Sequence, residues 1–150
     1  MARKRHHRQA WPALPPRGMR PRLTQQQLQD LSLANHQNLE ALAKGQADED
    51  ILWQWVGGCL TWCRVADVLS LGLEEMNAQL QLVVDVVTRY GRTGRAVFTG
   101  PEYQLAKLGV GYMDDLAQIV DQATATAATV WAEARCNAMA AQHPSRRKAA

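Results

Sequence analysis

The sequence predicts an all-α protein, an antiparallel bundle of four helices whose last helix is long. Alanine, leucine and glutamine are abundant and runs of β-branched residues are scarce, a composition that favours helix over strand. Apolar residues recur at the helical spacing of about 3.6 in four segments. The 150 residues suffice for one domain with a buried core. A basic, proline-rich arm precedes this domain, and we expect the arm to be disordered or extended.

The first helix is expected to begin at Thr24. Thr24 and Gln27 fit a capping box, in which the threonine oxygen accepts from the Gln27 amide and the glutamine side chain reaches back. Apolar residues then follow the helical period as far as Leu42, and Gly45 is a natural stop.

The second helix is expected to start at Asp48, where acidic residues suit the helix dipole, and to run to about Ser70 before Gly72. Its apolar residues cover more than one face, which predicts that it is the central, most buried helix. Gly57 and Gly58 lie in its middle, where each glycine costs roughly 1 kcal/mol relative to alanine. We therefore expect a neighbouring helix to approach closely at this pair, so that Gly58→Leu destabilises the protein through overpacking.

The third helix is predicted from about Glu74 to Tyr90, with Gly91 as its stop. Its inward-facing residues are expected to be Met76, Leu80, Val83, Val84, Val87 and Tyr90.

The last segment opens with Pro101, a residue suited to the first turn of a helix. An apolar stripe then continues without a break in phase, which predicts a single helix of about forty residues. The stripe consists of Leu105, Leu108, Tyr112, Leu116, Ile119, Ala123, Ala127, Val130 and Ala134. Threonines weaken the middle of this helix, so a break near Asp121 that yields five helices is the alternative. The end of so long a helix either projects, with Trp131 and Met139 as anchors for a partner, or packs on the second helix.

Charge divides the chain into an arm of residues 1–22, a helical domain of residues 23–142 and a basic tail of residues 143–150. The helical domain holds seven basic and fourteen acidic residues, a net charge of −7. The tail carries Arg146, Arg147 and Lys148. The arm carries seven basic residues and no acidic one: Arg3, Lys4, Arg5, Arg8, Arg17, Arg20 and Arg22.

The arm predicts non-specific contact with nucleic acid, since flexible basic segments gain affinity by releasing counterions from phosphates. An acidic domain repels phosphate, so the arm is expected to supply the binding, helped by Arg92 and Arg95. Trp11, among the arginines, is a candidate for base intercalation or for anchoring the arm. Basic arms also dock on acidic proteins or remain solvated. The alternative function is therefore a protein-interaction module, acting on a partner or a second copy, with no nucleic-acid role.

Residues 89–102 read RYGRTGRAVFTGPE, with glycines between arginines ahead of a helix start. A phosphate-binding loop of the Walker type needs a different glycine spacing and a lysine, and both are missing here. The sequence therefore predicts a turn between two helices, with anion contact at Arg92 and Arg95 as the alternative.

The sequence predicts a non-enzymatic protein that holds no metal or cofactor and binds no small-molecule substrate. Cys59 and Cys63 have a spacing that suits zinc, but no ligand set accompanies them, and we expect buried, reduced thiols. The acidic pairs at 74–75 and 114–115 lack the Glu-x-x-His pattern of di-iron bundles. His36 and Glu40, one helical turn apart, are expected to form a surface pair.

Three further expectations concern packing and location. Trp53, Trp55 and Trp62 have apolar neighbours and are expected in the core rather than stacked on bases. No apolar segment is long enough to span a membrane, and no apolar stretch follows the basic N-terminus as in a secretory signal. With an odd number of cysteines as well, the sequence predicts a cytoplasmic protein.

The pattern GRTGR-x-x-FTGPE, the Ala/Asp-rich segment after it and the basic arm resemble small uncharacterised proteins of proteobacterial prophages and other mobile elements. The resemblance covers roughly residues 24 to 140. It implies an accessory protein of a phage or plasmid and assigns no role to any residue.

Overall fold

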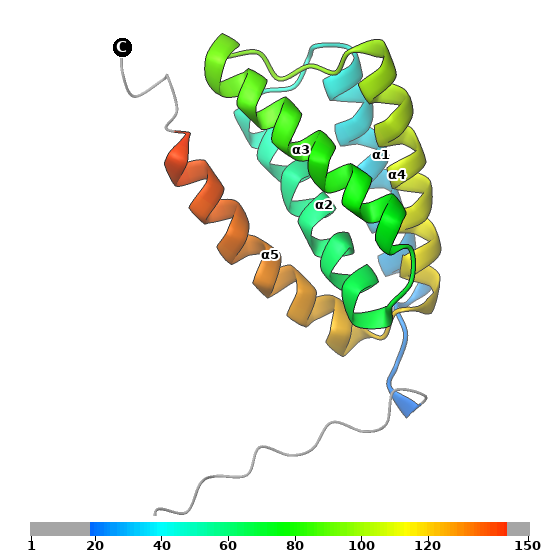
Figure 1. The fold of residues 1–150 in the computed structure, drawn as a ribbon. Helices are drawn as coiled ribbons and strands as arrows, with labels where there is room; N and C mark the ends of the chain where they lie inside the picture. Colours follow the sequence, from blue (N-terminus) through cyan, green and yellow to red (C-terminus); the bar gives the residue numbers. More distant parts are fainter. Residues whose placement is uncertain (1–18, 144–150) are drawn as a thin grey trace, which may run out of the picture.

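Five helices and no strand make up the described part of the chain, residues 19–143 of a computed structural model (Figure 1). The all-α prediction is confirmed. The helices are α1 Gln25–Ala43, α2 Glu49–Leu69, α3 Leu73–Thr93, α4 Gly100–Ile119 and α5 Gln122–Gln142. They run alternately up and down, so neighbours along the chain are antiparallel (Figure 1).

Helix α2 is the centre of the fold, as predicted. It contacts each of the other four helices, whereas α5 packs on α2 alone among the five (Figure 1). Leu52, Val56 and Cys59 of α2 are fully buried. Trp55 meets Phe98 edge to face, with ring centroids 5.1 Å apart. The molecule is therefore a four-helix bundle of α1 to α4, with α5 laid along the outside of α2.

The predicted starts of α1 and α2 are confirmed because local capping determines them. Thr24 and Gln27 form both hydrogen bonds of the capping box, and Asp48 accepts from the Ile51 amide at 2.9 Å. The predicted end of α3 is wrong. The helix continues through Gly91 to Thr93, and Gly94, with a φ of 71°, is its left-handed cap.

The predicted forty-residue final helix is also wrong, and the five-helix alternative is correct. Helix α4 ends at Ile119, and Val120 is extended with a ψ of 143°. The buried Asp121 caps α5 by accepting from the Thr124 amide at 2.8 Å and its hydroxyl at 2.7 Å. The break lets α5 leave the bundle of α1 to α4 and pack on α2. Of the two alternatives for the end of this segment, packing on the second helix is therefore correct: α5 packs on α2, and both Trp131 and Met139 lie against the core.

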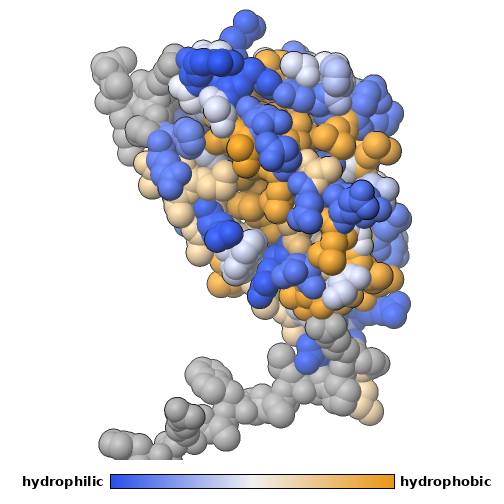
Figure 2. All heavy atoms as spheres, viewed as in Figure 1, coloured by the Kyte–Doolittle hydropathy of each residue, from blue (hydrophilic) through white to orange (hydrophobic). Residues whose placement is uncertain are grey.

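Helix α4 buries a face that matches the predicted one only in part: Leu116 is buried and Leu105 packs against the core, as expected. Leu108, Tyr112 and Ile119 are exposed, and apolar residues reach the surface over α3 and α4 (Figure 2). The buried face consists of Ala106, Gly109, Val110, Met113, Leu116 and Ala117. Its small residues let α4 approach closely, and the buried Gln79 of α3 packs directly on Gly109. On α3 the predicted face is partly correct, since Met76, Val83 and Val87 are buried while Val84 is exposed.

The last residues of the arm are held against the α4–α5 junction. The Gln122 amide donates to the Pro21 carbonyl at 2.9 Å, and the Gln122 side chain donates to the Arg22 carbonyl at 3.0 Å. Arg22 also forms an isolated antiparallel bridge with Asp121. Pro21 and Arg22, which were expected to belong to a disordered or extended arm, are therefore bonded to the helical domain. Residues 1–18 of the arm, with the tail beyond residue 143, lie outside the described residues. None of the described helices is both long enough and apolar enough to cross a membrane.

Candidate functional site

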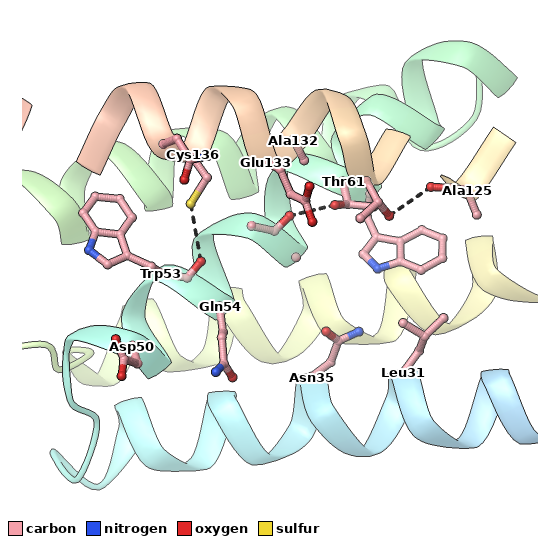
Figure 3. A pocket seen from close by; sticks show the side chains of 15 residues that line it. Leu31, Asn35, Asp50, Trp53, Gln54, Thr61, Ala125, Ala132, Glu133 and Cys136 are labelled. Atoms are coloured by element: carbon pink, nitrogen blue, oxygen red, sulfur yellow. Dashed lines mark hydrogen bonds between the residues drawn. The ribbon is translucent and has the colours of Figure 1, made fainter. Parts of the chain in front are cut away.

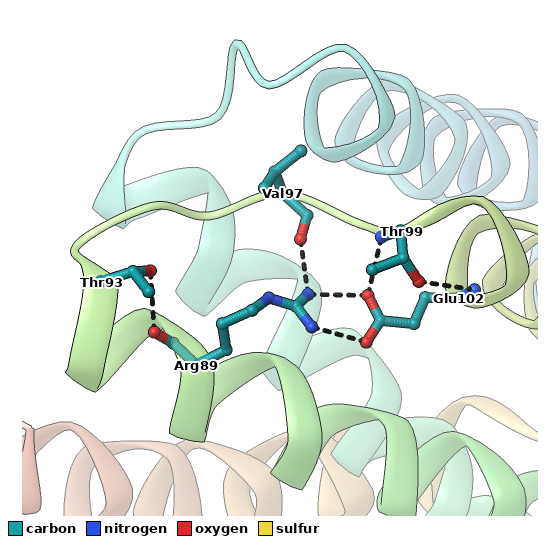
Figure 4. A network of polar contacts seen from close by, with 5 residues as sticks. All are labelled: Arg89, Thr93, Val97, Thr99 and Glu102. Atoms are coloured by element: carbon teal, nitrogen blue, oxygen red, sulfur yellow. Dashed lines mark hydrogen bonds and ion pairs between the residues drawn. The ribbon is translucent and has the colours of Figure 1, made fainter.

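The connection between α3 and α4 forms a closed polar network (Figure 4). Both terminal nitrogens of Arg89 donate to the Glu102 carboxylate, at 2.8 and 2.7 Å, and one also donates to the Val97 carbonyl at 2.7 Å. Glu102 in turn accepts from the Thr99 amide at 2.8 Å within the capping box of α4. A carboxylate of the chain thus already lies at the start of α4, where a bound anion would be expected. The prediction of a helix-to-helix turn is confirmed.

Replacing Glu102 with glutamine should make the protein less stable at neutral pH and less sensitive to acid. The hydrogen bonds from Arg89, foremost, lower the pKa of Glu102. The contribution of Glu102 to stability is therefore complete above its pKa in the unfolded chain, near 4.3. It is lost as the pH falls through the lower pKa of the folded protein. We expect Glu102→Gln to lower the free energy of unfolding by about 2 kcal/mol at pH 7. In urea titrations this difference should shrink below about pH 4. Glu74→Gln, at the exposed start of α3, is the control and should change stability by less than about 0.5 kcal/mol.

The structure does not bring all the predicted nucleic-acid residues together. Arg92 and Arg95 lie where α3 ends, whereas Arg20 and Arg22 lie at the α4–α5 junction (Figure 1). The 20-residue helix α4 spans the distance between the two ends, about 30 Å. Arg3, Lys4, Arg5, Arg8 and Arg17, together with Trp11, fall outside the described residues.

Three arginines gather around Trp131 on the outer side of α2 and α5. The guanidinium carbons of Arg64 and Arg135 lie 5.4 and 4.9 Å from the centre of the Trp131 ring. Arg20 and Arg64 line a cavity of about 390 Å³ beside the same ring. Asp121 lies 4.0 Å from Arg20, and Asp67 lies 3.1 Å from Arg64. We call Arg20, Arg64, Trp131 and Arg135 the arginine cluster. The sequence gives one weak signal of it, since Arg135 follows Trp131 by one helical turn.

A groove of about 620 Å³ lies on the opposite side of α5, between α1, α2 and α5 (Figure 3). Leu31 and Asn35 of α1 face Glu133 and Cys136 of α5 across it (Figure 3). Its walls include Trp53 and Trp62, and its charged residues are Asp50 and Glu133. The full lining is Leu31, Asn35, Asp50, Trp53, Gln54, Gly57, Gly58, Thr61, Trp62, Ala125, Thr129, Ala132, Glu133, Cys136 and Asn137.

The glycine pair of α2 forms the floor of this groove, so the expected close approach of a helix at Gly57 and Gly58 is wrong. A methyl group added at Gly57 would meet no described atom within 4 Å. One added at Gly58 would lie 3.5 Å from the Asn35 side-chain oxygen, an ordinary contact. A first side-chain carbon therefore fits at both positions, and the space at Gly57 is open.

The tryptophans and cysteines of α2 are mostly core residues, as predicted. Trp55 and Trp62 are buried, while Trp53 is only partly buried and lines the groove. Burial raises the pKa of Cys63 to about 12, and its thiol donates to the Met76 carbonyl at 3.2 Å. Burial also raises the pKa of Cys59 well above its usual value.

The predicted surface pair of His36 and Glu40 is wrong. His36 lies 3.4 Å from Asp114 of α4, and Glu40 accepts from the Tyr103 hydroxyl at 2.9 Å. Both residues therefore join α1 to α4. No three His, Cys, Asp or Glu side chains within residues 19–143 are grouped so that they could hold a metal ion.

These features define an all-α protein, a four-helix bundle with a fifth helix laid against its central helix. The chain matches no protein-family model, no curated protein and no solved structure.

Proposed function

We propose that this is a non-enzymatic cytoplasmic accessory protein that binds nucleic acid without sequence preference, of the kind encoded by phages and other mobile elements. The observation that carries the proposal is the position of the arginine cluster. Arg20 belongs both to that cluster and to the segment that leads into the basic arm. Arg20 thereby connects the chain of the basic arm to Arg64 and Arg135 on a domain of net negative charge.

The chemistry of the cluster suits a nucleic-acid strand. Arginine side chains bind phosphate oxygens, and an aromatic ring flanked by guanidinium groups offers a surface for base stacking. The acidic partners Asp67 and Asp121 reduce the local charge, so the domain surface alone is a weak site. Most of the affinity is therefore expected from the arm. This predicts steep salt dependence, with a slope of about −0.9 in log K against log salt for each phosphate neutralised on duplex DNA.

Mobility-shift titrations at 50 to 200 mM salt test the proposal. Neutralising Arg3, Lys4, Arg5 and Arg8 with glutamine should reduce the salt slope by about 4. The double variant Arg64→Gln, Arg135→Gln should reduce it by about 2. The matched control is Arg92→Gln, Arg95→Gln, which removes the same charge at the far end of α4 and should leave the slope nearly unchanged.

Full-length protein that fails to shift DNA or RNA even at 50 mM salt would refute the proposal. So would arm variants that bind as tightly as the unaltered protein. Equal effects of the two double variants would mean that bulk charge, and not the arginine cluster, governs binding.

The groove favours a second candidate function, a protein-interaction module. It is a largely apolar concavity of about 620 Å³ with a few polar groups, in which the side chains of a partner could be buried. This second function would be favoured if the full-length protein bound no nucleic acid and no segment of the same chain occupied the groove.

A further inference from the structure

The groove between α1, α2 and α5 has the character of a site for an extended peptide. Two tryptophans and the glycine pair of α2 line it, and the glycines contribute no side chains. Aromatic-lined grooves of this kind bind proline-rich segments in the polyproline II conformation, which loses little entropy on binding. A polyproline II helix has three residues per turn, so every third residue lies on the same face.

One segment of this chain has the matching chemistry. Residues 11–17 read WPALPPR, in which Pro12 and Pro15 are three apart and therefore lie on the same face of a polyproline helix. The segment also supplies the large apolar side chains of Trp11 and Leu14 and ends in the cation of Arg17.

The charges of the groove and the segment are complementary. Apart from Cys136, the ionisable residues that line the groove are Asp50 and Glu133, both acidic. No basic residue is among the described residues of the lining. The segment and its flanks carry only positive charge, with Arg8 before it and Arg17 at its end. Opposite charges at the rim favour this occupant over an acidic peptide.

Pro21 and Arg22 lie at the end of α5 where the groove also ends, whereas the Arg20 side chain lies in the arginine cluster on the other side of α5. Pro21 and Arg22 are bonded to Gln122, about one helical turn from Ala125 in the groove lining. From Ala125 to Asn137 the groove follows α5 for about 18 Å. A polyproline II segment rises about 3.1 Å per residue, so residues 11–17 cover a similar length, about 22 Å, and only residues 18–20 separate them from the attachment point at Pro21.

We infer that residues 11–17 dock in the groove of the same chain, with the apolar side chains against Trp53 and the glycine floor and Arg17 at the acidic rim. Docking there anchors the arm beside α5 and leaves Arg3, Lys4, Arg5 and Arg8 beyond the groove, available to a partner. The inference stands apart from nucleic-acid binding, because its test contains no nucleic acid.

Photochemical cross-linking of the full-length protein tests it. A benzophenone amino acid in place of Leu14 should cross-link chiefly to residues 50–62 and 125–137, mapped by mass spectrometry of the digested protein. An equal mixture of isotopically light and heavy protein separates links within one chain from links between two. We expect links within one chain.

Two variants make the test specific to the groove. Gly57→Leu, which meets no described atom at its first side-chain carbon, should keep the fold and lower the yield of groove links by about tenfold. Glu133→Gln should lower it by up to about fivefold, since it removes one exposed charge partner. The matched control is Gly111→Leu, on the exposed side of α4, where an added side-chain carbon also meets no described atom within 4 Å and the yield should not change.

Several results would overturn the inference. They are links that fall outside the groove, links between chains, no links at all, and a yield unaffected by Gly57→Leu in protein whose circular dichroism is unchanged. Links between chains would assign the groove to a second copy. An absence of links to the groove would assign the groove to a different protein as its binding partner.

Discussion

Gly109→Ala should lower the free energy of unfolding by about 3 kcal/mol, a large effect for the addition of one methyl group. The methyl group would overlap the side-chain amide of Gln79, which is only 1% exposed. Gln79 donates to the Leu105 carbonyl at 2.9 Å, and a displacement of its buried amide by the methyl group would break this hydrogen bond. The preference of alanine for helices offsets at most about 1 kcal/mol of the overpacking and of the lost hydrogen bond. Urea denaturation measures the loss, and the Tm should fall by about 10 °C.

Gly111→Ala is the matched control, two residues further along α4. Its added methyl group meets no described atom within 4 Å, so alanine should stabilise the protein by up to about 1 kcal/mol. Truncating the obstacle should also relieve the clash: in the Gln79→Ala background, Gly109→Ala should cost far less than in the unaltered protein. A Gly109→Ala variant as stable as the parent would show that Gln79 does not define this contact.

Asp121→Ala should destabilise the protein by about 3 kcal/mol and should loosen α5 before the rest of the fold. The carboxylate accepts from both the amide and the hydroxyl of Thr124, and its own side chain is 7% exposed. Alanine removes the helix cap and leaves the buried Thr124 hydroxyl without its acceptor. Since α2 is the one described helix on which α5 packs, the amides of α5 should exchange with solvent faster in the variant, which hydrogen-exchange mass spectrometry measures.

The contribution of Asp121 should depend on pH. Burial alone raises its pKa, but the hydrogen bonds from Thr124 and the charge of Arg20 outweigh burial, so the pKa lies below its usual value. The stabilising effect is therefore complete above about pH 4 and is lost as the pH falls through the folded value. Asp48→Ala is the control: Asp48 caps α2 with one bond to Ile51 but is exposed, and its loss should cost only about 1 kcal/mol. Equal losses from the two variants would contradict the special role given to Asp121.

Local signals in the sequence determined the helices themselves. Thr24, Asp48 and Thr99 begin helices because their side chains accept from backbone amides three residues ahead, an interaction that needs no distant partner. The all-round apolar character of α2 likewise specified its central position. Interactions of this range are predictable from neighbouring residues alone.

The tertiary structure decided which face of each helix is buried and which residues share a surface. The face of α4 with larger residues is exposed and the face around Gly109 is buried, because the close fit to Gln79 depends on a residue thirty positions away. The exit from helical geometry at Val120 likewise overrides an apolar periodicity that continues past it. The arginine cluster and the groove arise from α5 crossing α2, and their residues are separated by up to about a hundred positions. Charge and capping are properties of the chain, whereas close approach, open space and shared surfaces exist only once the helices have packed.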